Sequence, residues 1–113
     1  MSSYEEGQVW AYRSRRGEER SLVKIQRVEA DPETSEPIFH VSLVGLKWPG
    51  THVLAHAPVS KATLDMSVTF LCPDPGEFPS PEEGIVAWKR ARGGVYSVSL
   101  AAIAEMGDFS SIG

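Results

Sequence analysis

Apolar and polar side chains alternate in three segments in the first half of the chain. The segments are GQVWAYRSR (residues 7–15), SLVKIQRVE (21–29) and IFHVSLVGL (38–46). Successive side chains of a strand point to opposite faces, so a period of two predicts strands with one buried face. Turn residues around Gly17 separate the first two segments, and a polar stretch bounded by prolines, residues 31–37, precedes the third. The sequence therefore predicts an N-terminal hairpin followed by a third strand.

The second half of the chain carries signals for helices. Ser60 is a predicted N-cap, because its hydroxyl can accept from an amide of the first turn, and the apolar side chains from Leu64 to Leu71 predict the buried face of the helix that follows. The preceding residues 52–59 are expected to run irregularly, since Pro58 lacks an amide hydrogen. A second helix is predicted from Pro81, where a capping serine, a proline and a glutamate occur in the order of a capping box.

The last part of the chain predicts one more strand and one more short helix. GVYSVS (residues 94–99) begins at the second of two glycines, Gly93 and Gly94, that end the second helix, and it has the composition of a short strand. Ser99 is a predicted cap for the segment LAAIAEM. Strands that precede helices indicate an α+β fold. We expect one domain, residues 1–113, with a small curved, mainly antiparallel sheet (hairpin, third strand and late strand) packed with two helices.

Composition and charge limit the classes of function. No apolar run is long enough to span a bilayer, and the acidic N-terminus lacks the pattern of a secretory signal. The single cysteine, Cys72, cannot form an internal disulfide and predicts a reducing, cytoplasmic location, with the thiol filling space in the core. A net charge of -4 disfavours nucleic acid as a partner.

The three histidines do not predict a metal or catalytic site. His52 and His56 are four residues apart, but Pro58 disfavours the helix that would place them on one face. Zinc sites usually carry closely spaced pairs of cysteines or histidines, and the sequence has no GxSxG, HExxH or glycine-rich phosphate motif. We therefore expect no catalytic residue, no metal and no cofactor, with His40 on the mixed face of the third strand and His56 orienting the chain before the helix.

Aromatic and basic side chains supply the candidate binding residues. An arginine cluster beside two aromatic residues at the hairpin can bind RNA or an acidic protein surface, although Glu18 and Glu19 cancel much of its charge. Trp48, flanked by breakers, is either a core residue or an exposed anchor. The predicted partner-binding residues are Trp10, Tyr12, Arg13, Arg15, Arg16, Arg20, Trp48 and His56.

Three segments of the sequence together resemble one group of proteins. They are EGQVWAYRSRRGEE at the start, HAPVSKATLDMSV in the middle and EEGIVAWKRARGGVYSVSLAAI near the end. With these segments the chain resembles a group of small, functionally uncharacterised bacterial proteins of about this length. The resemblance implies a fold but no activity, cofactor or catalytic residue.

The sequence thus predicts a non-enzymatic, cytoplasmic protein-binding module, a monomer or a homodimer, that does not bind membranes. Its most concrete form is an immunity or inhibitor protein whose partner is a toxin or another enzyme, since such proteins share its small size and acidity. One alternative is a small nucleic-acid-binding domain that uses the arginine-rich hairpin tip. Another is a small enzyme with His52 or His56 in a pocket between loop and sheet.

Overall fold

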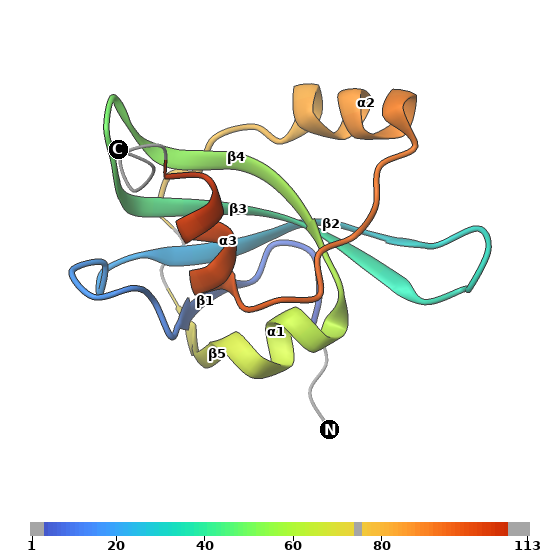
Figure 1. The fold of residues 1–113 in the computed structure, drawn as a ribbon. Coiled ribbons are helices and arrows are strands. Elements are labelled where there is room, and N and C mark those ends of the chain that lie inside the picture. The colour runs from blue at the N-terminus through green and yellow to red at the C-terminus, as the bar shows by residue number, and fades with distance from the viewer. Residues whose placement is uncertain (1–3, 74–75, 109–113) are drawn as a thin grey trace.

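Strands form a single antiparallel sheet in the computed structural model, which describes residues 4–73 and 76–108 (Figure 1). The strands are β1 (Val9–Tyr12), β2 (Leu22–Ala30), β3 (Pro37–Trp48), β4 (Thr51–Val59) and β5 (Val68–Cys72). Their order across the sheet is β4-β3-β2-β1-β5, so the two edges are β4 and β5. The predicted hairpin and third strand are confirmed as β1, β2 and β3, which pair in succession.

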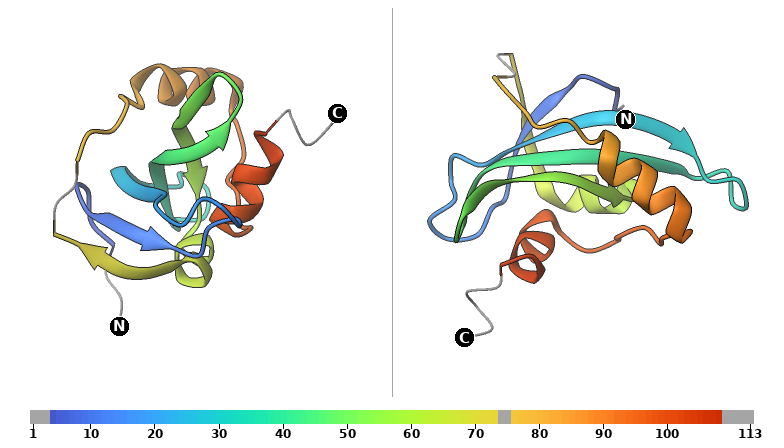
Figure 2. Two further views of the ribbon diagram at one scale, coloured as in Figure 1. Left: turned by 90° about the vertical axis from the view of Figure 1, so that its left-hand side faces the viewer. Right: turned by 90° about the horizontal axis from the view of Figure 1, so that it is seen from above.

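Three helices cover the two faces of this sheet in the described part of the chain: α1 (Lys61–Ser67), α2 (Glu82–Ala91) and α3 (Leu100–Met106). Figure 2 shows α2 on one side of the curved sheet and α1 and α3 on the other. The fold is therefore α+β, as the sequence predicted. None of the helices that the structure describes is long and apolar enough to cross a membrane.

The hydrophobic core lies between the sheet and the helices α1 and α3. The predicted inward face of β3, formed by Phe39, Val41 and Leu43, is buried there with side chains from both helices. The opposite face of β3 is also buried, because α2 covers it: His40 and Ser42 are both 0% exposed. A strand enclosed on both faces has few places for a polar side chain, so His40 and Ser42 need hydrogen-bond partners inside the protein.

Residues 52–59, which the sequence predicted to be irregular, form the edge strand β4. Gly50, at φ 79°, makes the turn after Trp48, and the chain returns antiparallel to β3. Pro58 is compatible with this strand because an edge strand needs its amides on one side only. Tyr96 covers the other side of β4 near its end, where its amide donates to the carbonyl of Pro58.

The helix predicted after Ser60 is shorter than expected. The serine caps α1 by accepting from the amide of Thr63, but α1 ends at Ser67, and Val68–Cys72 form β5 on the outer side of β1. Valine, threonine and phenylalanine favour a strand, and pairing with β1 satisfies the backbone that the helix would otherwise satisfy. Phe70 and Leu71, predicted to be buried, are therefore exposed.

The late strand predicted at residues 94–99 is a single bridge between Tyr96 and Val59, so β4 and β5 complete the sheet in its place. Tyr96 makes two backbone hydrogen bonds here: its amide donates to the carbonyl of Pro58, and its carbonyl accepts from the amide of Ser60. The two helices of this region begin where the sequence predicted them, but the predicted capping box is wrong, because Pro81 and not Ser80 is the N-cap of α2, with no side-chain cap hydrogen bond. A helix begins within one residue of Pro81, and Ser99 caps α3 by accepting from the amide of Ala102.

Candidate functional site

A chain of hydrogen bonds joins three titratable side chains beneath α2. Glu29 Oε1 lies 2.6 Å from His40 Nε2, and His40 Nδ1 lies 2.7 Å from His56 Nε2. The two imidazole rings are nearly parallel, with an interplanar angle of 22° and centroids 5.0 Å apart. The three residues come from β2, β3 and β4, which are neighbours in the sheet, so the pairing of the strands brings them together.

Helix α2 closes over these side chains at Gly84 and Trp88. The indole of Trp88 meets the ring of His40 edge to face, with centroids 5.0 Å apart. A Cβ atom on Gly84 would lie 2.5 Å from His56 Cβ and 2.8 Å from His56 Nδ1, which is closer than real contacts allow. Glycine inside a helix costs about 1 kcal/mol relative to alanine, so its presence here fits the close approach of α2 to His56.

The ionisation state of Glu29, at one end of the hydrogen-bonded chain, determines which ring nitrogens of His40 and His56 carry hydrogens. Burial raises the pKa of Glu29, but hydrogen bonds and charges from His40 and Lys89 outweigh it and lower the pKa overall, so Glu29 is ionised at neutral pH. The carboxylate accepts from His40 Nε2, and in a neutral His40 the other nitrogen, Nδ1, must then accept from His56 Nε2. In a neutral His56 this leaves Nδ1 without a hydrogen.

His56 is the end of the hydrogen-bonded chain that solvent reaches. Every fully buried side-chain nitrogen or oxygen among the described residues has a hydrogen-bond partner, and no described group bonds His56 Nδ1, so solvent reaches this atom. Burial, together with the charge of His40, lowers the pKa of His56 to about 4. The two rings therefore do not carry a positive charge at the same time near neutral pH.

Two hollows flank Trp88 at opposite ends of the hydrogen-bonded chain. One has a volume of about 400 Å³ and is lined by His56, Pro58, Trp88, Tyr96 and residues 93–95. The other, of about 680 Å³, is lined by Glu29 together with Lys89, Arg92 and the turn between β2 and β3. Among the described residues, no Lys, Arg, Asp or Glu lines the first hollow, whereas the second carries both signs of charge.

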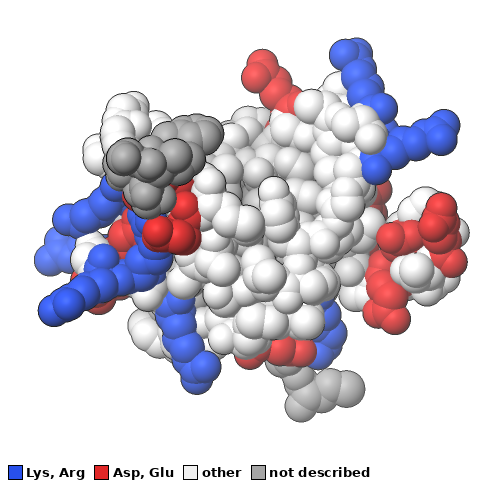
Figure 3. All heavy atoms as spheres, viewed as in Figure 1, with Lys and Arg blue, Asp and Glu red and all other residues white. Residues whose placement is uncertain are grey.

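The predicted arginine cluster does not act as a unit. Arg15 donates to Glu18, Glu105 and Asp108 at 2.7–3.0 Å, and its hydrogen bond to Glu18 is the main reason why the pKa of that buried carboxyl is lowered. Arg15 therefore stabilises the fold and has no free donor face for a nucleic acid. Figure 3 shows acidic and basic side chains mixed at this end of the molecule and only acidic ones projecting from the turn between β2 and β3.

The other predicted binding residues of the hairpin divide into buried and exposed groups. Tyr12 is buried and hydrogen-bonded to Ser21 at 2.6 Å, and burial raises its pKa to about 12. Trp10 is half-buried, and its indole donates to Gln8. The side chains of Arg13, Arg16 and Arg20 are exposed and form no ion pair among the described residues.

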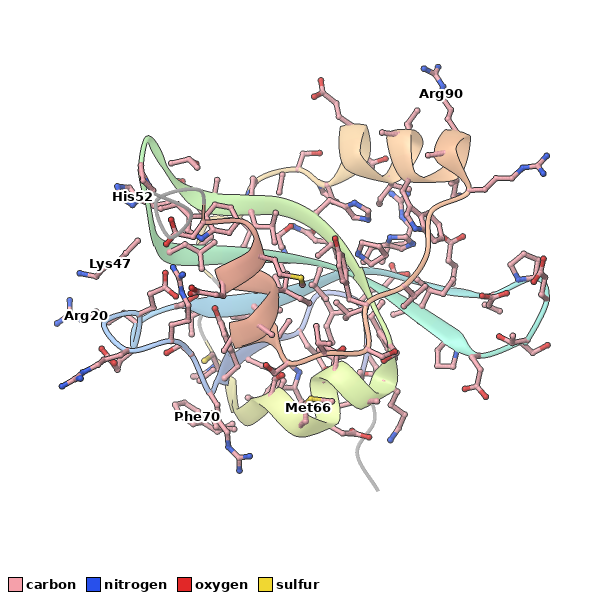
Figure 4. All side chains as sticks on the ribbon, viewed as in Figure 1. Arg20, Lys47, His52, Met66, Phe70 and Arg90 are labelled. Carbon is pink, nitrogen blue, oxygen red and sulfur yellow. The ribbon has the colours of Figure 1, made fainter. Side chains whose placement is uncertain are left out.

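Trp48 and His52 lie at the turn between β3 and β4, away from the His40–His56 pair. The indole of Trp48 donates to the carbonyl of Ala104 at 2.9 Å and packs on Gly107, so Trp48 holds α3 against the sheet and is not an exposed anchor. The ring of His52 bonds the carbonyl of Leu46 at 2.8 Å, and Figure 4 shows it at the same end of the sheet as Lys47 and Arg20. The three histidines therefore do not converge.

The edge strand β5 presents the other candidate surface. Phe70 is 63% exposed and Leu71 is 50% exposed, and Figure 4 shows Phe70 projecting from the body of the protein. Beyond the pairing with β1, no backbone hydrogen bond in the described part of the chain reaches Val68–Cys72 except the one that joins Val68 to Leu64. Cys72, predicted to fill the core, is only half-buried here.

The sequence analysis predicted neither the hydrogen bond between His40 and His56 nor the exposed edge of β5. It correctly kept His52 and His56 off a shared helix but treated residues 52–59 as irregular, so the pairing of β4 with β3, which joins the rings of His40 and His56, was not foreseen. Among the described residues no group of three His, Cys, Asp or Glu side chains is arranged to hold a metal ion. Comparison with protein-family models, with curated proteins and with solved structures found no match to the chain.

Proposed function

We propose that the chain is a protein-binding module that accepts an extended segment of a partner protein along the outer edge of β5. The role that we propose for this binding is that of an immunity or inhibitor protein, whose partner is a toxin or another enzyme. Addition of a strand to an open edge is a common mode of peptide recognition: backbone hydrogen bonds supply affinity, and side chains on alternate faces supply specificity.

The observation that carries this proposal is the combination of a free backbone edge and exposed apolar side chains in β5. The sequence of the strand, VTFLC, contains no charged residue. Soluble proteins usually protect an open edge with charges, prolines or a covering segment, because such an edge pairs readily with other chains. Phe70 and Leu71 are adjacent, so they point to opposite faces and both faces of an added strand would gain apolar contacts.

The opposite edge of the sheet is protected near its end and serves there as an internal comparison. On β4, Pro58 lacks a donor, and Tyr96 bonds the backbone at Pro58 and Ser60. The last three residues of β4 are buried. The first three residues of β4 are exposed, but the most exposed large apolar side chains of the two edge strands are on β5, where Phe70 is 63% and Leu71 50% exposed against 37% for Val53 of β4. We therefore assign the binding surface to β5.

Arg13 indicates the chemistry of the partner. Its amide donates to the carbonyl of Ser67, which places Arg13 beside the start of β5, and its exposed side chain makes no ion pair within the described residues. We therefore propose a partner segment of uncharged, β-prone residues with a carboxylate at the end that faces Arg13. Of the residues predicted for binding from sequence, Trp10 and Tyr12 pair with β5 from β1, and Arg13 is the exposed charged one beside its start.

Selection of peptides from a displayed random library tests the proposal. The wild-type chain is the bait, and the double variant Phe70→Lys with Leu71→Lys is used for counter-selection. Selected peptides are expected to be apolar with an acidic end, to perturb backbone amides of residues 68–72 in NMR spectra, and to lose at least about tenfold in affinity against the double variant, since two apolar contacts are replaced by charges. Val86→Lys, on exposed α2, is the matched control.

Three outcomes would contradict the proposal. The first is that no peptide is enriched on the wild-type chain relative to the double variant. The second is that Val86→Lys weakens binding as much as the change in β5. The third is that sedimentation shows the chain pairing with itself through β5, since a second copy would then occupy the edge.

A further inference from the structure

The hydrogen-bonded chain beneath α2 connects two hollows and does not take part in the surface proposed above. His40 is its fully buried middle member, His56 borders the hollow of about 400 Å³, and Glu29 borders the hollow of about 680 Å³. A fully buried histidine needs a partner for each ring nitrogen, and here Glu29 bonds His40 Nε2 while His56 bonds His40 Nδ1. Satisfying His40 uses only Nε2 of His56, so the outer nitrogen of His56, Nδ1, is left over and reached by solvent.

We propose that Glu29, His40 and His56 form a proton relay whose accepting atom is His56 Nδ1, and that the hollow beside His56 binds an uncharged aromatic compound carrying an acidic hydroxyl group, a phenol. The ligand donates its hydroxyl hydrogen to Nδ1 and transfers the proton along the chain.

The lining of the hollow supports this class of ligand. Trp88 and Tyr96 offer aromatic surfaces, and Pro58 and Val95 add apolar ones, which suits a flat ring. No Lys or Arg side chain in the part of the chain that the structure describes lines this hollow, so an anionic carboxylate or phosphate would be desolvated there without a cation. Besides the hydroxyl of Tyr96, the lining side chains offer the acceptor nitrogen of His56, which requires an O–H or N–H donor on the ligand.

The transfer balances in atoms and charge. The O–H bond of the phenol breaks, and its proton binds His56 Nδ1. His56 gives up the hydrogen on Nε2 to His40 Nδ1, across the distance of 2.7 Å. His40 then carries hydrogens on both nitrogens and is paired with the carboxylate of Glu29. The products are a phenolate, a neutral His56 that now donates from Nδ1, and a charged His40 next to a negative partner.

The charged groups around the relay favour this end state. Glu29 from β2 accepts from His40, and Lys89 from α2 lies 3.5 Å from the other carboxylate oxygen. Arg27 and Glu82 pair with one another farther along β2 and α2. The new positive charge therefore forms beside Glu29 and not on His56, where burial disfavours it. Glu29 is 29% exposed, which gives the buried proton a route to solvent through the second hollow.

4-Nitrophenol is a suitable probe because its ionised form absorbs visible light. At a pH where the free probe is mostly neutral, saturation with the protein is expected to raise the ionised fraction of the bound probe about tenfold, which corresponds to one pKa unit. His56→Phe keeps a ring of similar shape but removes the acceptor, so both binding and ionisation should be lost. His52→Phe, at the far end of the same strand, is the matched control and should behave as wild type.

Glu29→Gln separates the relay from simple binding. It keeps a hydrogen-bond acceptor for His40 but removes the charge that stabilises the transferred proton. The probe should bind with an affinity within about threefold of wild type, while the increase in ionised fraction is lost. An increase equal to that of wild type would overturn the relay, and failure of the wild-type protein to bind the probe, or unchanged binding by His56→Phe, would overturn the site.

Nitrogen-15 NMR of the imidazole rings provides a test that does not depend on any variant folding. In the wild-type protein without ligand at neutral pH, His56 Nδ1 is expected to carry no hydrogen and His56 Nε2 to carry one. A hydrogen on Nδ1 under these conditions would overturn the assignment of the accepting atom.

Discussion

Gly84 of α2 lies so close to His56 of β4 that a Cβ atom at position 84 would come within 2.5 Å of His56 Cβ. This contact fixes how closely the helix approaches the sheet. It also leaves His56 Nδ1 uncovered, because the same Cβ atom would lie 2.8 Å from that nitrogen. The lack of a Cβ atom at Gly84 thus determines both how closely α2 packs on the sheet and whether solvent reaches His56 Nδ1.

Replacement of Gly84 by alanine should destabilise the protein, although alanine favours a helix by about 1 kcal/mol. The methyl group cannot fit without moving α2, and such overpacking costs about 1–3 kcal/mol. Urea denaturation measures the loss, and near-ultraviolet circular dichroism of Trp88 reports the displacement of α2. Ala87→Gly, at an exposed position of the same helix, should lose about 1 kcal/mol without changing the Trp88 signal. A more stable Gly84→Ala protein would show that the contact is not restrictive.

Stability should fall as the pH is lowered from 6.5 to 4. The pKa of His56 is about 4 in the folded protein and 6.5 in the unfolded chain, so the unfolded chain binds more protons throughout this range. The loss should be about 1–2 kcal/mol, less than the full shift implies because solvent partly screens His56. The lowered pKa of Glu29 adds a loss of the same sign at still lower pH.

Urea denaturation at several pH values between 7 and 4 measures this dependence. His56→Gln cannot take up the proton, so its stability should change less over the same range. An equally steep loss in that variant would assign the acid sensitivity to other groups.

Arg15 and Arg16 are adjacent arginines for which we expect opposite results. The side chain of Glu18 is 1% exposed and depends on Arg15, so Arg15→Ala leaves a buried carboxylate without its cation and should cost about 3–5 kcal/mol. The exposed Arg16 forms no ion pair within the described residues, and Arg16→Ala should change the free energy of unfolding by less than about 0.5 kcal/mol. Thermal denaturation of the two variants compares them directly. Equal effects would mean that the Arg15 cluster is solvated and dispensable.

Local sequence patterns predicted the parts of the fold that depend on neighbours in the chain. The period of two in residues 21–29 and 38–46 predicted β2, β3 and the buried face of β3 with Phe39 and Val41. Serine hydroxyls at Ser60 and Ser99 predicted the starts of two helices, because a cap acts on amides two or three residues away.

Patterns that depend on distant partners misled the prediction. Val68 and Phe70 fit the face of a helix that continues from Ser60, yet β1 offers them a strand to pair with, and pairing prevails. The proline in β4 indicated a break, but at an edge of the sheet it needs no donor on its outer side. The roles of Arg15 and Trp48 changed for the same reason, since their partners Glu105, Asp108 and Ala104 lie far along the chain.

Periodicity and caps in the sequence were enough to predict a curved antiparallel sheet with helices, and the sequence contains no GxSxG, HExxH or glycine-rich phosphate motif. The hydrogen bond between His40 and His56, sixteen residues apart, and the position of β5 at an edge of the sheet are visible only in the folded chain. The physical reason is that hydrophobic periodicity and capping act over one or two turns of chain. Strand order, and with it the contacts between side chains on different strands, depends on which edges find partners when the whole chain folds.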